Sequence, residues 1–193
     1  MWLMTKIGEP AAAQGLMEVG GDSLRMLAAD DFPAIQKLRE TAPPEIFDLP
    51  GTSGEFAGFF EGLMRKPWSM PMLCCQAAEP VGACLMTVGQ LKNLNAYLVA
   101  VFDEPVSAVG ALALYIRHCF WSFPLHRIYT QLAMTQAVKP HIDLLLRAGF
   151  KLEGTLVGHI SSADGPLDAV VVAILRDEFE GWCLENRPEL SLT

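Results

Sequence analysis

The sequence predicts one α/β domain with a mixed, mostly antiparallel sheet and helices on both faces. Its 193 residues suit a single core. Apolar runs at 72–76, 81–88 and 95–102 are separated by short turn signals, which is typical of an antiparallel strand meander. After residue 103, segments with helical spacing alternate with further strand-like runs. This order fits neither a purely doubly wound sheet nor a barrel, because it combines a meander with a helical crossover.

The first third of the chain predicts one strand and two helices. Residues 23–27 form the expected strand, and Asp30 or Asp31 then caps a helix that ends before Pro43. A short helix is expected from about Ser53.

The second half carries stronger periodic signals. Leu112, Tyr115, Ile116 and Cys119 recur at spacings of three and four, which predicts an amphipathic helix. The expected elements are then a helix over 107–120, a strand over 126–132, a helix over 140–147 that ends at Gly149, and strands over 152–160 and 169–175 joined by an Asp164-Gly165 turn.

Composition excludes some partners and suggests the domain limits. The net charge is −8, from 14 Lys and Arg against 22 Asp and Glu, so a nucleic-acid backbone is repelled overall and we expect no nucleic acid. Apolar stretches are too short to cross a membrane, and we expect a cytoplasmic protein with no membrane contact. Residues 1–22 are expected to be a flexible leader, 23–182 the domain and 183–193 a C-terminal tail.

The five cysteines are predicted to be reduced thiols in the core. They lie mostly in apolar segments and lack the Cys-x-x-Cys spacing of a zinc site, so no metal is expected. A catalytic cysteine remains an alternative, although such a thiol needs an electropositive and partly exposed setting.

Several segments resemble the GNAT superfamily, the Gcn5-related N-acetyltransferases, and within it the ribosomal-protein and aminoglycoside N-acetyltransferases. The strongest resemblance is in 144–156, where Gly149-Phe150 follows a helix and Glu153-Gly154 follows in turn. The segments 111–120, 125–129 and 168–179 are similar to other parts of the family pattern. The resemblance implies the GNAT fold and acetyl-CoA, or another acyl-CoA, as co-substrate.

The resemblance also implies where the coenzyme binds. In the family it lies between two splayed strands, with its pyrophosphate on backbone N–H groups at a helix N-terminus. The corresponding residues here are Val101, Phe102, Val106, Ser107, Ala108, Val109 and Gly110. The loop departs from the family pattern, because Asp103 stands in place of Gln or Arg and Val106 in place of the first glycine.

Two residues are candidates for catalysis. The tyrosine that often serves as the family's acid is Leu145 here, which leaves His141 as a possible acid or base. The alternative for His141 is a surface histidine at a helix start. Tyr97 lies on a strand that would line the cleft, and its alternative is a place in the core.

The leading hypothesis is an acyl-CoA-dependent N-acyltransferase that acts on an amine of a small molecule or a protein. The alternatives are a GNAT-fold binding or interaction domain without catalysis, and an acyltransferase that uses a carrier-protein donor. The aromatic residues Phe56, Phe59, Phe60 and Trp68 suggest a homodimer contact or an apolar wall of the acceptor pocket.

Overall fold

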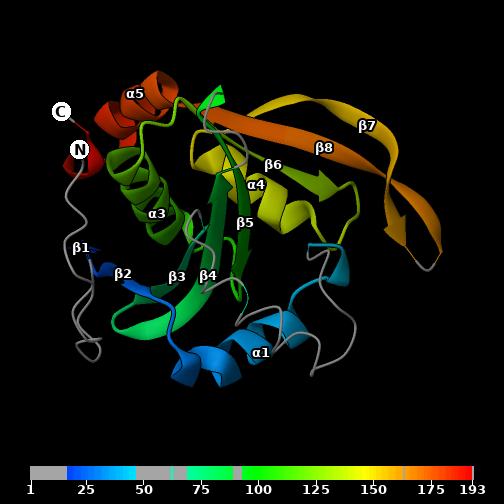
Figure 1. The fold of residues 1–193 in the computed structure, drawn as a ribbon, viewed down its shortest axis with the longest axis horizontal. Helices are drawn as coiled ribbons and strands as arrows, with labels where there is room; N and C mark the ends of the chain where they lie inside the picture. The colour runs from blue at the N-terminus through cyan, green and yellow to red at the C-terminus, as the bar shows by residue number, and fades with distance from the viewer. Residues whose placement is uncertain (1–16, 47–61, 63–68, 89–92, 163, 193) are drawn as a thin grey trace.

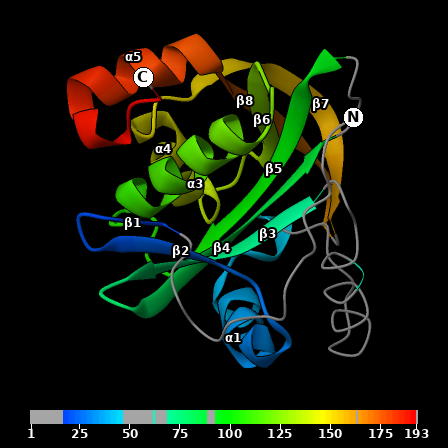
Figure 2. The same cartoon turned by 60° about the vertical axis from the view of Figure 1, so that its left-hand side comes forward.

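The computed structural model describes residues 17–46, 62, 69–88, 93–162 and 164–192. One eight-stranded sheet has the order β1-β2-β3-β4-β5-β6-β8-β7. Helices α3 and α4 cover one face and α1 covers the other (Figures 1 and 2). The strands are β1 (Met17–Val19), β2 (Asp22–Met26), β3 (Ser69–Gln76), β4 (Glu79–Val88), β5 (Asn95–Phe102), β6 (Arg127–Ala133), β7 (Lys151–Ser162) and β8 (Gly165–Leu175). The helices are α1 (Phe32–Thr41), α3 (Val109–Ser122), α4 (Lys139–Arg147) and α5 (Arg176–Asn186), with short 3₁₀ turns η1 (Ala29–Asp31), η2 (Pro44–Ile46) and η4 (Pro188–Leu190).

The predicted fold class and the predicted meander are confirmed. Strands β3, β4 and β5 pair antiparallel in sequence order, and β5 then pairs in parallel with β6. A parallel neighbour requires a crossover, which α3 supplies. The other described pairs in the sheet are antiparallel.

Helix α3 is central because almost all of its residues are buried. Its apolar side chains pack on the sheet residues that share a face with Leu98 and Phe102. Tyr115 is fully buried, and its hydroxyl donates a hydrogen bond of 2.7 Å to the carbonyl of Met70. A second, smaller core lies on the opposite face, where Ile35 and Leu38 of α1 pack against β3 and β5.

The ordered structure extends beyond the predicted domain limits at both ends. Strand β1 lies within residues 1–22, which were predicted to be a leader, and α5 continues into the predicted tail 183–193. Sequence reasoning missed α5, although the carboxylate of Glu178 accepts the backbone N–H of Leu175 at 3.1 Å, as a helix cap would. Arg176 also ties this helix to the end of α3, since it donates to the carbonyls of Phe120, Phe123 and Leu125.

Some predictions fall outside the described residues. These are the short helix from Ser53 and the aromatic residues Phe56, Phe59, Phe60 and Trp68. Among the described residues, no helix is both long and apolar enough to span a bilayer.

The cysteine prediction is confirmed, since all five thiols are free and buried. The Sγ atoms of Cys74 and Cys84 lie 3.7 Å apart. Burial raises the pKa of Cys84 and Cys119 far above its ordinary value, and raises the pKa of Cys183 to about 12. A thiol held in its neutral form is a poor nucleophile, so these residues belong to the core.

Candidate functional site

The sheet opens between β5 and β6. Their parallel pairing is limited to Asn95 with Arg127, Ala96 with Ile128 and Tyr97 with Tyr129. Beyond Tyr97 and Tyr129 the two strands splay toward their carboxyl ends, as the sequence predicted. An opening inside a sheet leaves backbone groups and side chains available to a ligand, so this splay is a candidate binding site.

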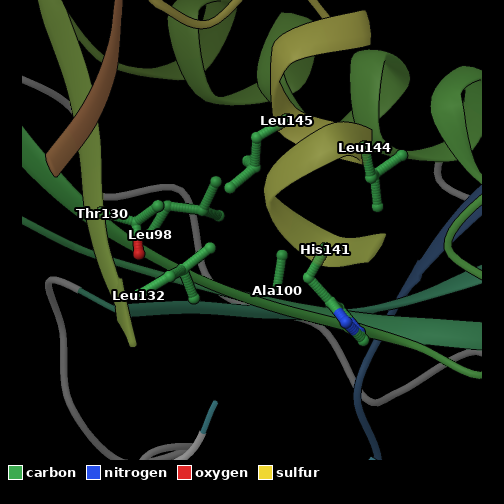
Figure 3. Close-up of a pocket in the computed structure, with 7 residues that line it drawn as sticks. All are labelled: Leu98, Ala100, Thr130, Leu132, His141, Leu144 and Leu145. Atoms are coloured by element: carbon green, nitrogen blue, oxygen red, sulfur yellow. The ribbon is translucent and has the colours of Figure 1, made fainter. Parts of the chain in front are cut away.

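A cavity occupies the splay on the face covered by α4 (Figure 3). Its volume has room for about one water molecule. The strand residues that line it occupy alternate positions, because successive side chains of a strand point to opposite faces. The lining consists of Leu98 and Ala100 from β5, Thr130 and Leu132 from β6, and His141, Leu144 and Leu145 from α4.

His141 is the titratable residue of this cavity. Its side chain is only 5% exposed, so the surface-histidine interpretation is wrong. Among the described residues, neither ring nitrogen of His141 has a hydrogen-bond partner. Burial lowers the pKa of His141 below its ordinary value, and the nearby carbonyl of Phe102 offsets only part of this shift. The imidazole is therefore neutral near pH 7 and can accept a proton, and once protonated it gives that proton up readily.

Local structure places this ring. The hydroxyl of Thr135 accepts the backbone N–H of Val138 at 3.2 Å, and Pro140 lies in the first turn of α4. The backbone N–H of His141 bonds to the carbonyl of Val138 at 2.9 Å. The start of α4 therefore directs the imidazole toward β5 of the sheet instead of toward solvent (Figure 3).

The loop between β5 and α3 is a set of tight turns. The N–H of Asp103 bonds to the carbonyl of Val81 at 3.0 Å, and the N–H groups of Ser107 and Ala108 bond within the loop at 3.2 and 3.3 Å. The side chains of Asp103 and Glu104 are exposed. The donors that remain for an anion are the first N–H groups of α3, which have no intrahelical acceptor.

Gly110 has a structural reason for lacking a side chain. A Cβ at this position would lie 2.0 Å from Oδ2 of Asp22 and 2.5 Å from Nη1 of Arg187. Asp22 is buried, accepts a hydrogen bond of 2.9 Å from Gln76 and lies 3.6 Å from the Arg187 guanidinium. The first turn of α3 thus already has a carboxylate of the protein beside it, and Gly110 makes room for that ion pair.

A cation that the sequence reasoning missed lies beside the same loop. Nη1 of Arg147, at the end of α4, donates a hydrogen bond of 2.7 Å to the carbonyl of Val106. The two residues are 41 positions apart, so no local pattern indicates the contact. The available signal was only a basic residue in the last turn of a helix.

The residues predicted to bind the coenzyme do not share one surface. Val101 packs in the core on the α1 face, Phe102 packs on the α3 face, and Ala108 is buried beneath the loop. Val106 is 70% exposed and Ser107 is exposed, while Val109 and Gly110 begin α3.

Tyr97 and His141, the two predicted catalytic residues, lie on opposite faces of the sheet. Leu98, which is next to Tyr97, faces the α4 cavity, so Tyr97 points the other way. Its ring meets Tyr129 edge to face, with centroids 5.5 Å apart. The described residues hold no group of three or more His, Cys, Asp or Glu side chains arranged for a metal ion.

Several solved structures share the fold of this chain. RimJ of Mycobacterium smegmatis, in complex with CoA-disulfide, superposes with a TM-score of 0.70 at 20% identity, covering 85% of this chain and 88% of that one. RimL, a ribosomal L7/L12 alpha-N-protein acetyltransferase in complex with coenzyme A, gives 0.71 at 16% identity, covering 86% and 99%. A chimera of spermidine N-acetyltransferase SpeG from Vibrio cholerae and hSSAT gives 0.68 at 17% identity, covering 83% and 98%.

This chain has the GNAT fold. No protein-family model matches the sequence, and no curated protein matches it. The GNAT resemblance inferred from 144–156 is confirmed at the level of fold. The loop of this chain differs from the family pattern, because the exposed carboxylate of Asp103 stands where the family has Gln or Arg. The family's tyrosine is Leu145 here, and His141 is buried nearby.

Proposed function

We propose that this chain is an acyl-CoA-dependent N-acyltransferase, with acetyl-CoA as the expected donor, that transfers the acyl group directly to an amine. The observation that carries the proposal is the β5–β6 splay, whose cavity is lined by a buried imidazole that has no hydrogen-bond partner in the described part of the chain. A buried polar group without a partner costs stability unless a ligand or water satisfies it. The coenzyme complexes of RimJ and RimL, which share the fold, support the choice of donor.

In this proposal, the residues of the splay position the donor thioester and exclude water from it. The amine nitrogen attacks the thioester carbonyl, a C–N bond forms and the C–S bond breaks. His141, being neutral, accepts a proton from that nitrogen and returns it to the leaving thiolate. The apolar lining of Leu98, Leu132 and Leu144 keeps the site dry, which strengthens each of these polar contacts.

The phosphates of such a donor meet a mixed environment. The first turn of α3 offers unpaired N–H groups, and Arg147 supplies a positive charge beside the loop. Asp103 and Glu104 oppose this attraction. The same loop favours the second candidate, a GNAT-fold binding domain without catalysis.

The acceptor is an amine of a small molecule or of a protein. Both classes occur among chains with this fold, since RimL acetylates ribosomal L7/L12 and SpeG acetylates spermidine.

The proposal is tested by acetyl-CoA calorimetry on the native protein and on Ala100→Leu. Ala100 lines the cavity, and a leucine there fills it, so affinity is expected to fall about tenfold or more while folding survives an overpacking cost of about 1–3 kcal/mol. The control is Val99→Leu, which places a leucine at the neighbouring residue, whose side chain points to the opposite face. Equal binding by native protein and Ala100→Leu would place the donor elsewhere. Absence of binding to the native protein would favour the binding domain.

A further inference from the structure

A second histidine lies on the sheet face that α4 does not cover. His159 of β7 is exposed, and its Nε2 lies 3.0 Å from Oε1 of Gln131 on β6. The two strands are not neighbours, because β8 lies between them. The contact passes over a part of β8 where small Ala169 pairs with both Ala133 and Leu156.

This contact lies at the mouth of the splay. Gln131 follows Tyr129, the last β6 residue paired with β5, by two positions, so the two side chains share a face. That face is opposite to the one where Thr130 and Leu132 line the His141 cavity. In the proposed reaction, an amine that approaches a thioester in the splay from the face opposite α4 passes the Tyr97–Tyr129 pair and the Gln131–His159 pair.

The hydrogen bond fixes the tautomer of His159. An amide oxygen only accepts hydrogen bonds, so Nε2 of His159 carries the proton and Nδ1 keeps a lone pair. The carboxylate of Asp168 lies beside this histidine, because its Oδ1 accepts the backbone N–H of Gly158 at 2.8 Å. The His159 ring is positioned by Gln131 and is exposed, so its Nδ1 can take a proton from an amine and pass it to water.

We propose that His159 is the group that deprotonates the acceptor, with Gln131 as its positioning residue. This inference rests on the proposed N-acyltransferase function. An acceptor amine is an ammonium ion at neutral pH and has no lone pair to attack with. Nδ1 of His159 takes one ammonium proton, and the neutral amine then attacks the thioester. The second nitrogen proton leaves through His141 to the thiolate, and His159 returns the first proton to solvent.

The test compares acceptors that do and do not need deprotonation. Thiol release from acetyl-CoA is measured with spermidine, with the α-amino group of a short peptide and with hydroxylamine, which is largely unprotonated at neutral pH. His159→Gln is expected to lower kcat/KM about 100-fold or more with an ammonium acceptor and to leave hydroxylamine within about threefold. The matched control is His126→Gln, an exposed histidine at the other end of β6, which should change neither.

The outcomes are distinguishable. The role of His159 would be overturned if His159→Gln lowered kcat/KM equally with all acceptors, or with none. It would also be overturned if the native protein acylated hydroxylamine but neither ammonium acceptor. Absence of thiol release with every acceptor would contradict the proposed function itself, and the His159 proposal with it. Without any activity measurement, ¹⁵N NMR should show the Nε2–H tautomer in the native protein and its loss in Gln131→Leu. The Nδ1–H tautomer in the native protein would also overturn the proposal.

Discussion

Neutralising the two loop carboxylates is expected to tighten acetyl-CoA binding. Asp103 and Glu104 are exposed at the start of the loop that leads into α3, beside the N–H groups proposed to receive the coenzyme phosphates. The change is Asp103→Asn with Glu104→Gln, which removes both charges and keeps the side-chain shapes. The backbone hydrogen bonds of the loop, such as Ser107 N–H to the Glu104 carbonyl, do not depend on these side chains.

The magnitude follows from Coulomb's law. A pyrophosphate with charge −2 at about 8 Å from a carboxylate is repelled by about 1 kcal/mol in water, so the two carboxylates together contribute about 2 kcal/mol without screening. Ionic strength of about 0.15 M has a Debye length of about 8 Å and reduces this to about 0.8 kcal/mol, whereas about 0.01 M leaves about 1.6 kcal/mol. The expected gain in affinity is therefore about fourfold at the higher salt and about 15-fold at the lower.

The assay is a calorimetric titration of both proteins at the two ionic strengths. The control is Asp30→Asn with Glu40→Gln, two exposed carboxylates of η1 and α1, on the side of the sheet opposite α3 and α4. It changes the net charge equally and should leave affinity nearly unchanged. Micromolar binding by the native protein that neither the loop substitutions nor salt alters would refute the reasoning, because the carboxylates would then lie far from the phosphates.

Two further predictions concern stability. His141→Leu removes two buried nitrogens that have no partner among the residues described by the structure, so urea unfolding at pH 7 should show a gain of about 1–2 kcal/mol while acyl transfer falls about 100-fold or more. Burial lowers the folded-state pKa of His141, so as the pH falls below about 6.5 the unfolded chain binds a proton that the folded chain does not. The unfolding free energy of the native protein should therefore fall by up to about 1.4 kcal/mol per pH unit relative to that of His141→Leu. Gly110→Ala should destabilise the fold by about 1–3 kcal/mol, because the new Cβ displaces Asp22 from Arg187, and a neutral result by urea unfolding would show that the pair moves freely.

The parts of the fold that the sequence predicted are those encoded by local patterns. The meander follows from short apolar runs with turn residues between them, and α4 follows from Pro140 at its start and Gly149 after its end. Gly149 has a φ of 91°, a conformation that favours glycine at a helix end. Helix α5 was missed because no apolar periodicity separates it from the closing strand, and only Phe179 and Cys183 among its residues are buried.

The candidate site was predicted less well because long-range packing determines it. His141 is buried because α4 lies over the splay, and a helix start by itself more often faces solvent. The contacts of Arg147 with Val106 and of His159 with Gln131 join residues 41 and 28 positions apart. Strand alternation alone, by contrast, places Tyr97 on the face of Val101 and opposite Leu98. The sequence could therefore have predicted that Tyr97 lies on the face opposite α4.

The two histidines show how one residue type serves two proton transfers in the proposed reaction. His141 is enclosed by apolar side chains, and burial keeps it neutral until a proton arrives from the reacting nitrogen. In the proposed reaction, His141 passes this proton to the thiolate. His159 is exposed and lies within hydrogen-bond distance of Gln131, and in the proposed reaction it passes the first proton to water. The two histidines lie on opposite faces of the sheet, so in the proposed reaction the amine loses its first proton to the exposed His159 and its second to the buried His141. That order matches the chemistry, since deprotonation must precede attack and protonation of the thiolate must follow it.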